Sequence, residues 1–103
     1  SDTVLKESLF KKFFPIKLES SVSVDNELSS KATTVQVVTS DKPGRLYKIL
    51  DAIYAIQHNV LSAKISTLGE KIFDIFQITD SKGKKITNSE DIKNIKNKIM
   101  SVL

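Results

Sequence analysis

The residues that could do chemistry cluster at one junction, Asp41-Lys42-Pro43-Gly44-Arg45, between a β-branched segment and a helical pattern. The junction takes one of the three glycines and one of the two prolines in a chain of 103 residues. When a strand passes through a glycine turn into a helix, backbone N–H groups stay free at the helix start, where carboxylates and phosphates bind. The junction therefore predicts either an anion-binding corner or only a tight turn.

Three residues of this junction have competing explanations. Asp41 is equally consistent with capping the helix and with contacting a ligand. Pro43 has a structural explanation, because its fixed φ and missing N–H suit the first turn of a helix. Gly44 is harder to explain by packing alone, and we expect it to keep side-chain atoms away from the free amides.

The rest of the chain offers little for catalysis. His58 is the only histidine and there is no cysteine, which excludes a disulfide, a thiolate zinc site and a cysteine nucleophile. The glycine-rich phosphate-binding patterns of nucleotide enzymes are missing as well. We expect no catalytic residue, no metal site and no cofactor in this chain, and we interpret His58 as a residue at the end of a helix.

The charge pattern does not favour a nucleic-acid or a membrane partner. Sixteen Lys and Arg against twelve Asp and Glu give a formal net charge of +4, but the lysines are spread along the chain, as on an ordinary solvated surface. No segment approaches the roughly 18 apolar residues that a membrane span needs, and the amino end lacks a signal-peptide core. We expect a cytoplasmic protein and, since the only methionine is Met100, a piece of a longer one.

Apolar periodicity predicts the elements that position the junction. From the amino end they are a linker or short helix over 1–19, a strand over 20–26, a strand over 33–40, a helix from 45 to about 58, strands over 60–67 and 71–79, and a helix that begins after Asn88. From residue 33 this order is β-α-β-β-α, the ferredoxin-like split βαβ unit without its last strand. We predict that strand 20–26 pairs with strand 33–40 and takes the place of the missing strand.

The fold class is then α+β, with a four-stranded antiparallel sheet and two helices on one face. The alternation in 60–67 predicts a half-buried strand. In the following strand the apolar residues divide between two faces, with Ile72, Phe76 and Ile78 on one and Phe73 and Ile75 on the other. One layer of helices covers only one face, so a partner subunit is the simplest cover for the second.

The segment DKPGRLYKILDAIYAIQHNVLSAKIST resembles the opening half of an ACT domain, a small regulatory module that binds amino acids. Asp41, Pro43, Gly44 and Leu46 match the family's loop and helix start, and Asn59 matches the start of its second strand. The following SAKISTLGEKIFDIFQITDSKGKKIT is similar to the carboxyl-terminal ACT domain of the bifunctional uridylyltransferase/uridylyl-removing enzymes, which modify the PII nitrogen-regulatory protein.

The resemblance covers residues 22–103 and implies a non-catalytic ACT domain over 20–103, in a parent nucleotidyltransferase that also has uridylyl-removing hydrolase activity. Glutamine or another amino acid would be the ligand. A second ACT domain would be the partner, either in a homodimer or as the preceding domain of the same chain, and PII would meet the full-length enzyme. The implied ligand-binding residues are Asp41, Pro43, Gly44, Arg45, Leu46 and Asn59. Arg45 stands where the family has leucine, which implies a more polar pocket edge.

Two alternatives stay open. The first is an ACT domain of another allosteric enzyme, such as a (p)ppGpp synthetase/hydrolase, although the TLGE and TDSKGKK matches argue against it. The second is a ferredoxin-like RNA-binding domain, which would carry its aromatic motif on residues 69–76. Against RNA binding, Ile72 stands at an aromatic position, Asp74 would put a negative charge in the middle of the platform, and strand 33–40 lacks a second aromatic motif.

Overall fold

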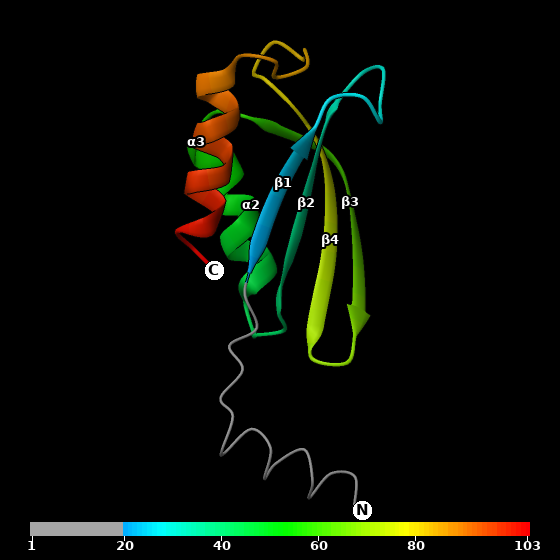
Figure 1. Ribbon diagram of the computed structural model, residues 1–103. Coiled ribbons are helices and arrows are strands. Elements are labelled where there is room, and N and C mark those ends of the chain that lie inside the picture. Colours follow the sequence, from blue (N-terminus) through cyan, green and yellow to red (C-terminus); the bar gives the residue numbers. More distant parts are fainter. Residues whose placement is uncertain (1–19) are drawn as a thin grey trace, which may run out of the picture.

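Four antiparallel strands form one sheet, and two helices cover one of its faces (Figure 1). The computed structural model describes residues 20–103, so the linker or short helix predicted over 1–19 lies outside the described residues. The elements are β1 (Ser21–Asp25), β2 (Thr33–Ser40), α2 (Arg45–Ala55), β3 (Asn59–Leu68), β4 (Lys71–Thr79) and α3 (Ser89–Met100). The predicted α+β, ferredoxin-like class is confirmed.

The strand β1 lies at one edge of the sheet, in the order β1-β2-β4-β3. Its pairing with β2 is antiparallel and places Val22 opposite Val37 and Val24 opposite Val35. Such β-branched side chains fit the pleated surface of a sheet. The predicted exchange is therefore confirmed, because the first strand occupies the place that the last strand takes in the usual order.

The core lies between the helices and the inner face of the sheet. Each helix turns one aliphatic stripe, with residues four apart, toward the strands. The buried core residues are Val35, Val37, Ile49, Ile53, Phe76, Ile78, Ile86, Ile95 and Ile99.

The strand β4 carries apolar side chains on both faces, as predicted. Ile72, Phe76 and Ile78 are buried on the inner face, and Phe73 and Ile75 are half-buried on the open face. In the described part of the chain, both helices lie on the inner side of the sheet, so the open face has no cover of its own (Figure 1).

The helix ends agree with the sequence at α3 and differ at α2. The Asn88 side chain accepts hydrogen bonds from the N–H groups of Glu90 and Asp91, at 2.8 and 3.2 Å. It is the predicted N-cap, with two acids in the first turn where they complement the helix dipole. The helix α2 ends at Ala55, earlier than predicted, because Gln57 takes a left-handed φ of 64° that a helix cannot contain.

The prediction that β3 is half-buried is wrong. A register shift between Val60 and Ser62 leaves Leu61 out of the regular pairing with β4, and Leu61 is 60% exposed. Every residue of β3 after Val60 is exposed. Ala63 and Ile65 lie opposite the inner-face residues Phe76 and Asp74, but the shift removes Leu61 from this alternation. β3 is also an edge strand that α2 covers only in part, so its apolar side chains meet solvent.

Candidate functional site

The strand–helix corner is built on a type II β-turn. The Arg45 N–H donates to the Lys42 carbonyl oxygen at 3.2 Å and closes a four-residue turn. Gly44 has φ 76° and ψ 1°, as the third residue of a type II turn does, and Pro43 stands at the second position, where proline is favoured. The positive φ explains the glycine, since other side chains are strained there.

The start of α2 keeps two amides free. Gly44 is the N-cap, and no side chain caps the helix. The first four amides of a helix have no partner within it. The Arg45 amide closes the turn and the Lys48 amide donates to the Gly44 carbonyl oxygen at 3.2 Å. Among residues 20–103, the N–H groups of Leu46 and Tyr47 have no acceptor. The corner therefore has the donors that an anion requires.

Neither Asp41 nor Pro43 has the structural role that the sequence allowed. Asp41 does not cap α2; its backbone N–H donates to the Glu70 carbonyl oxygen at 2.8 Å, in the turn between β3 and β4, and its side chain is exposed. Pro43 lies before the first helical residue, so its placement in the first turn of the helix was wrong. The Asp41 carboxylate thus lies at the rim of the corner.

Arg45 points into the protein rather than to the pocket edge. It is only 6% exposed, although it is the first residue of α2. Its Nη1 donates to the Thr39 hydroxyl and, at 3.1 Å, to the Ser40 carbonyl oxygen. The side chain therefore joins the end of β2 to the start of α2 across the turn, and it is less available to solvent than the resemblance implied.

The position of Asp74 differs from the one assumed in the sequence analysis. It lies on the inner face of β4 opposite Val37, fully buried, and not on the open face as the RNA-binding alternative assumed. Burial, and then the nearby Asp41 carboxylate, raise the pKa of Asp74 above its ordinary value. Its position two residues from both Ile72 and Phe76 was the signal for this face.

The structure does not bring Asn59 to the corner within one chain. Asn59 begins β3 opposite Thr79, and its side chain donates to the Asp80 carbonyl oxygen at 3.3 Å. The corner lies at the other end of the sheet, where Leu68 ends β3. The corner therefore contains the predicted site residues Asp41, Gly44, Arg45 and Leu46. Asn59 lies at the opposite end of the sheet.

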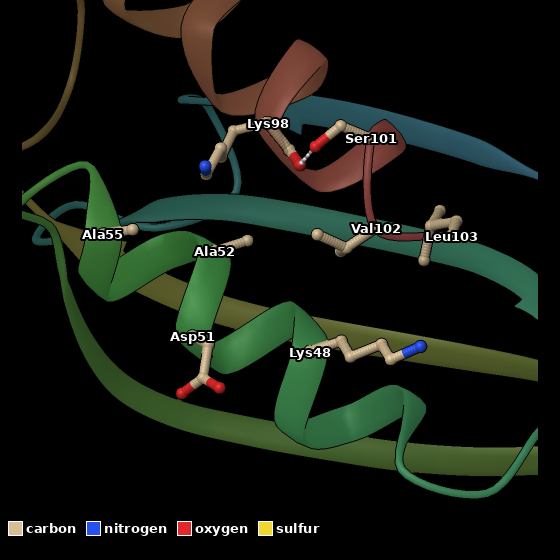
Figure 2. A pocket seen from close by; sticks show the side chains of 8 residues that line it. All are labelled: Lys48, Asp51, Ala52, Ala55, Lys98, Ser101, Val102 and Leu103. Carbon is tan, nitrogen blue, oxygen red and sulfur yellow. Dashed lines mark hydrogen bonds between the residues drawn. The ribbon is translucent and has the colours of Figure 1, made fainter.

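A groove with a volume of about 560 Å³ lies between the helices (Figure 2). It is lined by Lys48, Asp51, Ala52 and Ala55 of α2 and by Lys98, Ser101, Val102 and Leu103 at the end of α3. The Lys48 and Lys98 amino groups point to opposite ends of this groove (Figure 2). Without converging polar groups, the groove is a poorer candidate for a ligand site than the corner.

The part of the chain that the structure describes has no metal-binding constellation. No group of three or more His, Asp or Glu side chains comes together among residues 20–103. Over the same residues, no helix is both long and apolar enough to cross a membrane.

Known proteins share both the sequence pattern and the fold. A profile described as the ACR family N-terminal ACT domain matches residues 28–103. Bifunctional uridylyltransferase/uridylyl-removing enzymes from Bradyrhizobium diazoefficiens and Nitrobacter winogradskyi are each 33% identical, over 82% and 84% of this chain, and the matched region spans 9% of each relative.

A crystal structure of an unknown protein from Galdieria sulphuraria superposes with a TM-score of 0.55 at 24% identity, over 82% of this chain and 40% of that one. This likeness concerns the fold alone. The profile match extends over most of the described residues. The chain therefore belongs to the ACT-domain family.

Proposed function

We propose that this chain is the amino-acid-sensing regulatory domain, with glutamine as ligand, of a cytoplasmic PII uridylyltransferase/uridylyl-removing enzyme that controls nitrogen metabolism. The observation that carries the proposal is the uncapped start of α2, with free Leu46 and Tyr47 amides at the end of a loop that begins with the exposed Asp41. A free amino acid offers a carboxylate for such amides and an ammonium group for such an acid. Catalysis and recognition of PII belong to the rest of the parent protein.

A second ACT domain is the partner that this proposal requires, as another copy or as a neighbouring domain of the parent. In the described part of the chain β3 pairs only with β4, so its outer edge presents backbone donors and acceptors. Antiparallel pairing of two β3 strands would bring Asn59 of the second copy toward Leu68. The adjoining turn already holds Asp41 through the Glu70 carbonyl oxygen. Such pairing supports a site completed across the interface.

The glycine corner can be tested with a substitution that keeps its backbone. Gly44→Asn adds a side chain beside the free amides, and asparagine tolerates positive φ better than other residues do. A Cβ at Gly44 would meet no atom within 4 Å, so the domain should still fold. We expect glutamine to bind the wild-type chain in calorimetry and to bind Gly44→Asn at least about tenfold more weakly, since two amide contacts are blocked.

Gly83→Asn is the matched control. Gly83 has φ 81°, also has open space around its missing Cβ, and lies beyond the other end of the sheet. It should leave glutamine affinity unchanged. If Gly44→Asn binds glutamine as the wild type does, the corner is not the site. If glutamine binds neither the wild-type chain nor the chain joined to the rest of its parent, this chain is not the sensor.

A further inference from the structure

Asp74 is the one buried acid among the described residues, and the proposed corner does not yet use it. Its side chain is 0% exposed, and neither carboxylate oxygen has a hydrogen-bond partner within residues 20–103. A buried carboxylate without a donor is unfavourable until a proton or a cation neutralises it. The Asp74 carboxylate can therefore accept hydrogen bonds from a positively charged group.

The position of Asp74 is the inner side of the same corner. It pairs with Val37 on β2, and Thr39 lies one diagonal step away on the same face. Diagonal neighbours across a sheet are about 7–8 Å apart. The Thr39 hydroxyl accepts a hydrogen bond from Arg45, in the first turn of α2. The Asp41 carboxylate is near enough for its charge to raise the pKa of Asp74. Two carboxylates, the exposed Asp41 and the buried Asp74, are thus close enough to repel each other at this end of the sheet.

Arg45, the one buried cation among the described residues, is engaged elsewhere. Nη1 of Arg45 is held by the Thr39 hydroxyl and by the Ser40 carbonyl oxygen, with the Ser40 hydroxyl at 3.5 Å. Over the described chain no ion pair joins Arg45 to Asp74, whose carboxylate oxygens stay without any partner. Residues 20–103 therefore supply no partner that neutralises Asp74, which is the role that an incoming group can take.

We propose that Asp74 is the inner acceptor for the ammonium group of an α-amino acid bound at the Gly44 corner, and that Asp41 is the outer one. The inference rests on the proposed function and adds the residue that selects amino acids over carboxylic acids without an amine. One shared cation relieves the repulsion between two neighbouring carboxylates. The ligand enters beside Gly44, where space is open, and reaches Asp74 when the Arg45 side chain moves aside.

The test compares glutamine with its des-amino analogue, which keeps the carboxylate and the amide but lacks the ammonium group. Calorimetry of the 103-residue chain should show the analogue binding the wild type at least about tenfold more weakly than glutamine, as expected for a lost charge-assisted contact. Asp74→Asn, which removes the charge at nearly constant volume, should bind both compounds with similar, weak affinity.

Asp51→Asn is the control, because Asp51 is an exposed acid of α2 that lines the groove between the helices. It should keep the preference of the wild type. Carbon-13 NMR of the Asp74 carboxyl group provides a second measurement, since glutamine should shift its resonance and the des-amino analogue should not.

The outcomes separate this inference from the proposed function. Suppose that the wild type binds glutamine, that Asp74→Asn prefers glutamine over the des-amino analogue as strongly as the wild type does, and that glutamine does not shift the Asp74 resonance. This result overturns the role of Asp74 and leaves glutamine sensing in place. Failure of glutamine to bind both the wild-type chain and the chain joined to the rest of its parent overturns both. Loss of the preference in Asp74→Asn but not in Asp51→Asn supports the role of Asp74.

Discussion

The burial of Asp74 has a measurable effect on stability apart from any ligand. Its pKa is raised in the folded protein by burial, and secondarily by Asp41, relative to about 3.9 in an unfolded chain. The folded state therefore binds more protons between these two pKa values, and stability falls as the pH rises through that window. Above the folded pKa, the domain retains the full cost of the buried charge.

Asp74→Asn should therefore raise the free energy of unfolding at pH 7 by on the order of 1 kcal/mol, because an uncharged amide replaces an unpaired buried charge. The difference between mutant and wild type should shrink as the pH falls from the folded pKa toward about 4, the unfolded value, where the wild-type carboxylate becomes protonated. Urea unfolding followed by circular dichroism between pH 4 and 8 measures both. A difference that is constant over this range would contradict the assignment, and Asp51→Asn provides the baseline for an exposed acid.

At this scale the sequence specified some features and not others. The inner-face position of Asp74 follows from its spacing to Ile72 and Phe76, so it was predictable. The burial of Arg45 was not, since arginine is mostly exposed and only the tertiary contact with Thr39 draws it inward. Of the two explanations open for the junction, a tight turn suffices for Gly44, because the type II turn by itself demands its φ of 76°.

Among the elements, one hydrogen-bond network fixes the segment between β4 and α3 to the β1–β2 turn. The buried Thr33 hydroxyl donates to the Asn26 side chain at 2.7 Å and accepts from the Ile86 N–H at 2.8 Å. The Asn26 amide in turn donates to the Ile86 carbonyl oxygen at 2.9 Å. These bonds place the long connection that precedes the Asn88 cap.

Thr33→Val keeps the side-chain shape but removes the hydroxyl, so it leaves the Ile86 N–H and the Asn26 oxygen without a partner. We expect it to lower the free energy of unfolding by about 1–3 kcal/mol. Thr87→Val, in an exposed position of the same connection, should change it by less than about 0.5 kcal/mol. Equal effects of the two substitutions in urea unfolding would show that the network does not stabilise the domain.

The elements themselves were largely readable from the sequence. β2 and β4 have the predicted bounds, and α3 begins at the predicted cap, because alternation and capping are local signals. The end of α2 was misplaced, since the left-handed Gln57 carries no strong local signal. The exposure of β3 depends on which strand lies at the edge, and that is a property of the whole sheet.

For the whole molecule, the open edge at β3 predicts association. Leu61 is 60% and Ile65 46% exposed along this strand, so pairing of two copies would bury apolar surface as well as satisfy backbone groups. Leu61→Asp should shift a wild-type dimer toward monomer in sedimentation equilibrium, because a charge would enter the interface. Leu28→Asp, at a residue that is 75% exposed in the β1–β2 turn, should not. A wild-type chain that stays monomeric at high concentration would restrict the partner to another domain of the parent.

The exchange of the edge strand has a consequence for how the domain folds. In the usual order, the edge strand that pairs with the first strand is the last one in the sequence, so the two are far apart along the chain. Here β1 and β2 are consecutive. The Asp25 side chain stabilises their turn by accepting hydrogen bonds from the N–H groups of Glu27 and Leu28 at 2.7 and 2.8 Å. Closing a short loop costs little chain entropy, and hairpins form within roughly 1–10 μs. The sheet edge can therefore assemble as a local hairpin before α3 docks, so the slow step is left to the more distant pairing of β2 with β4.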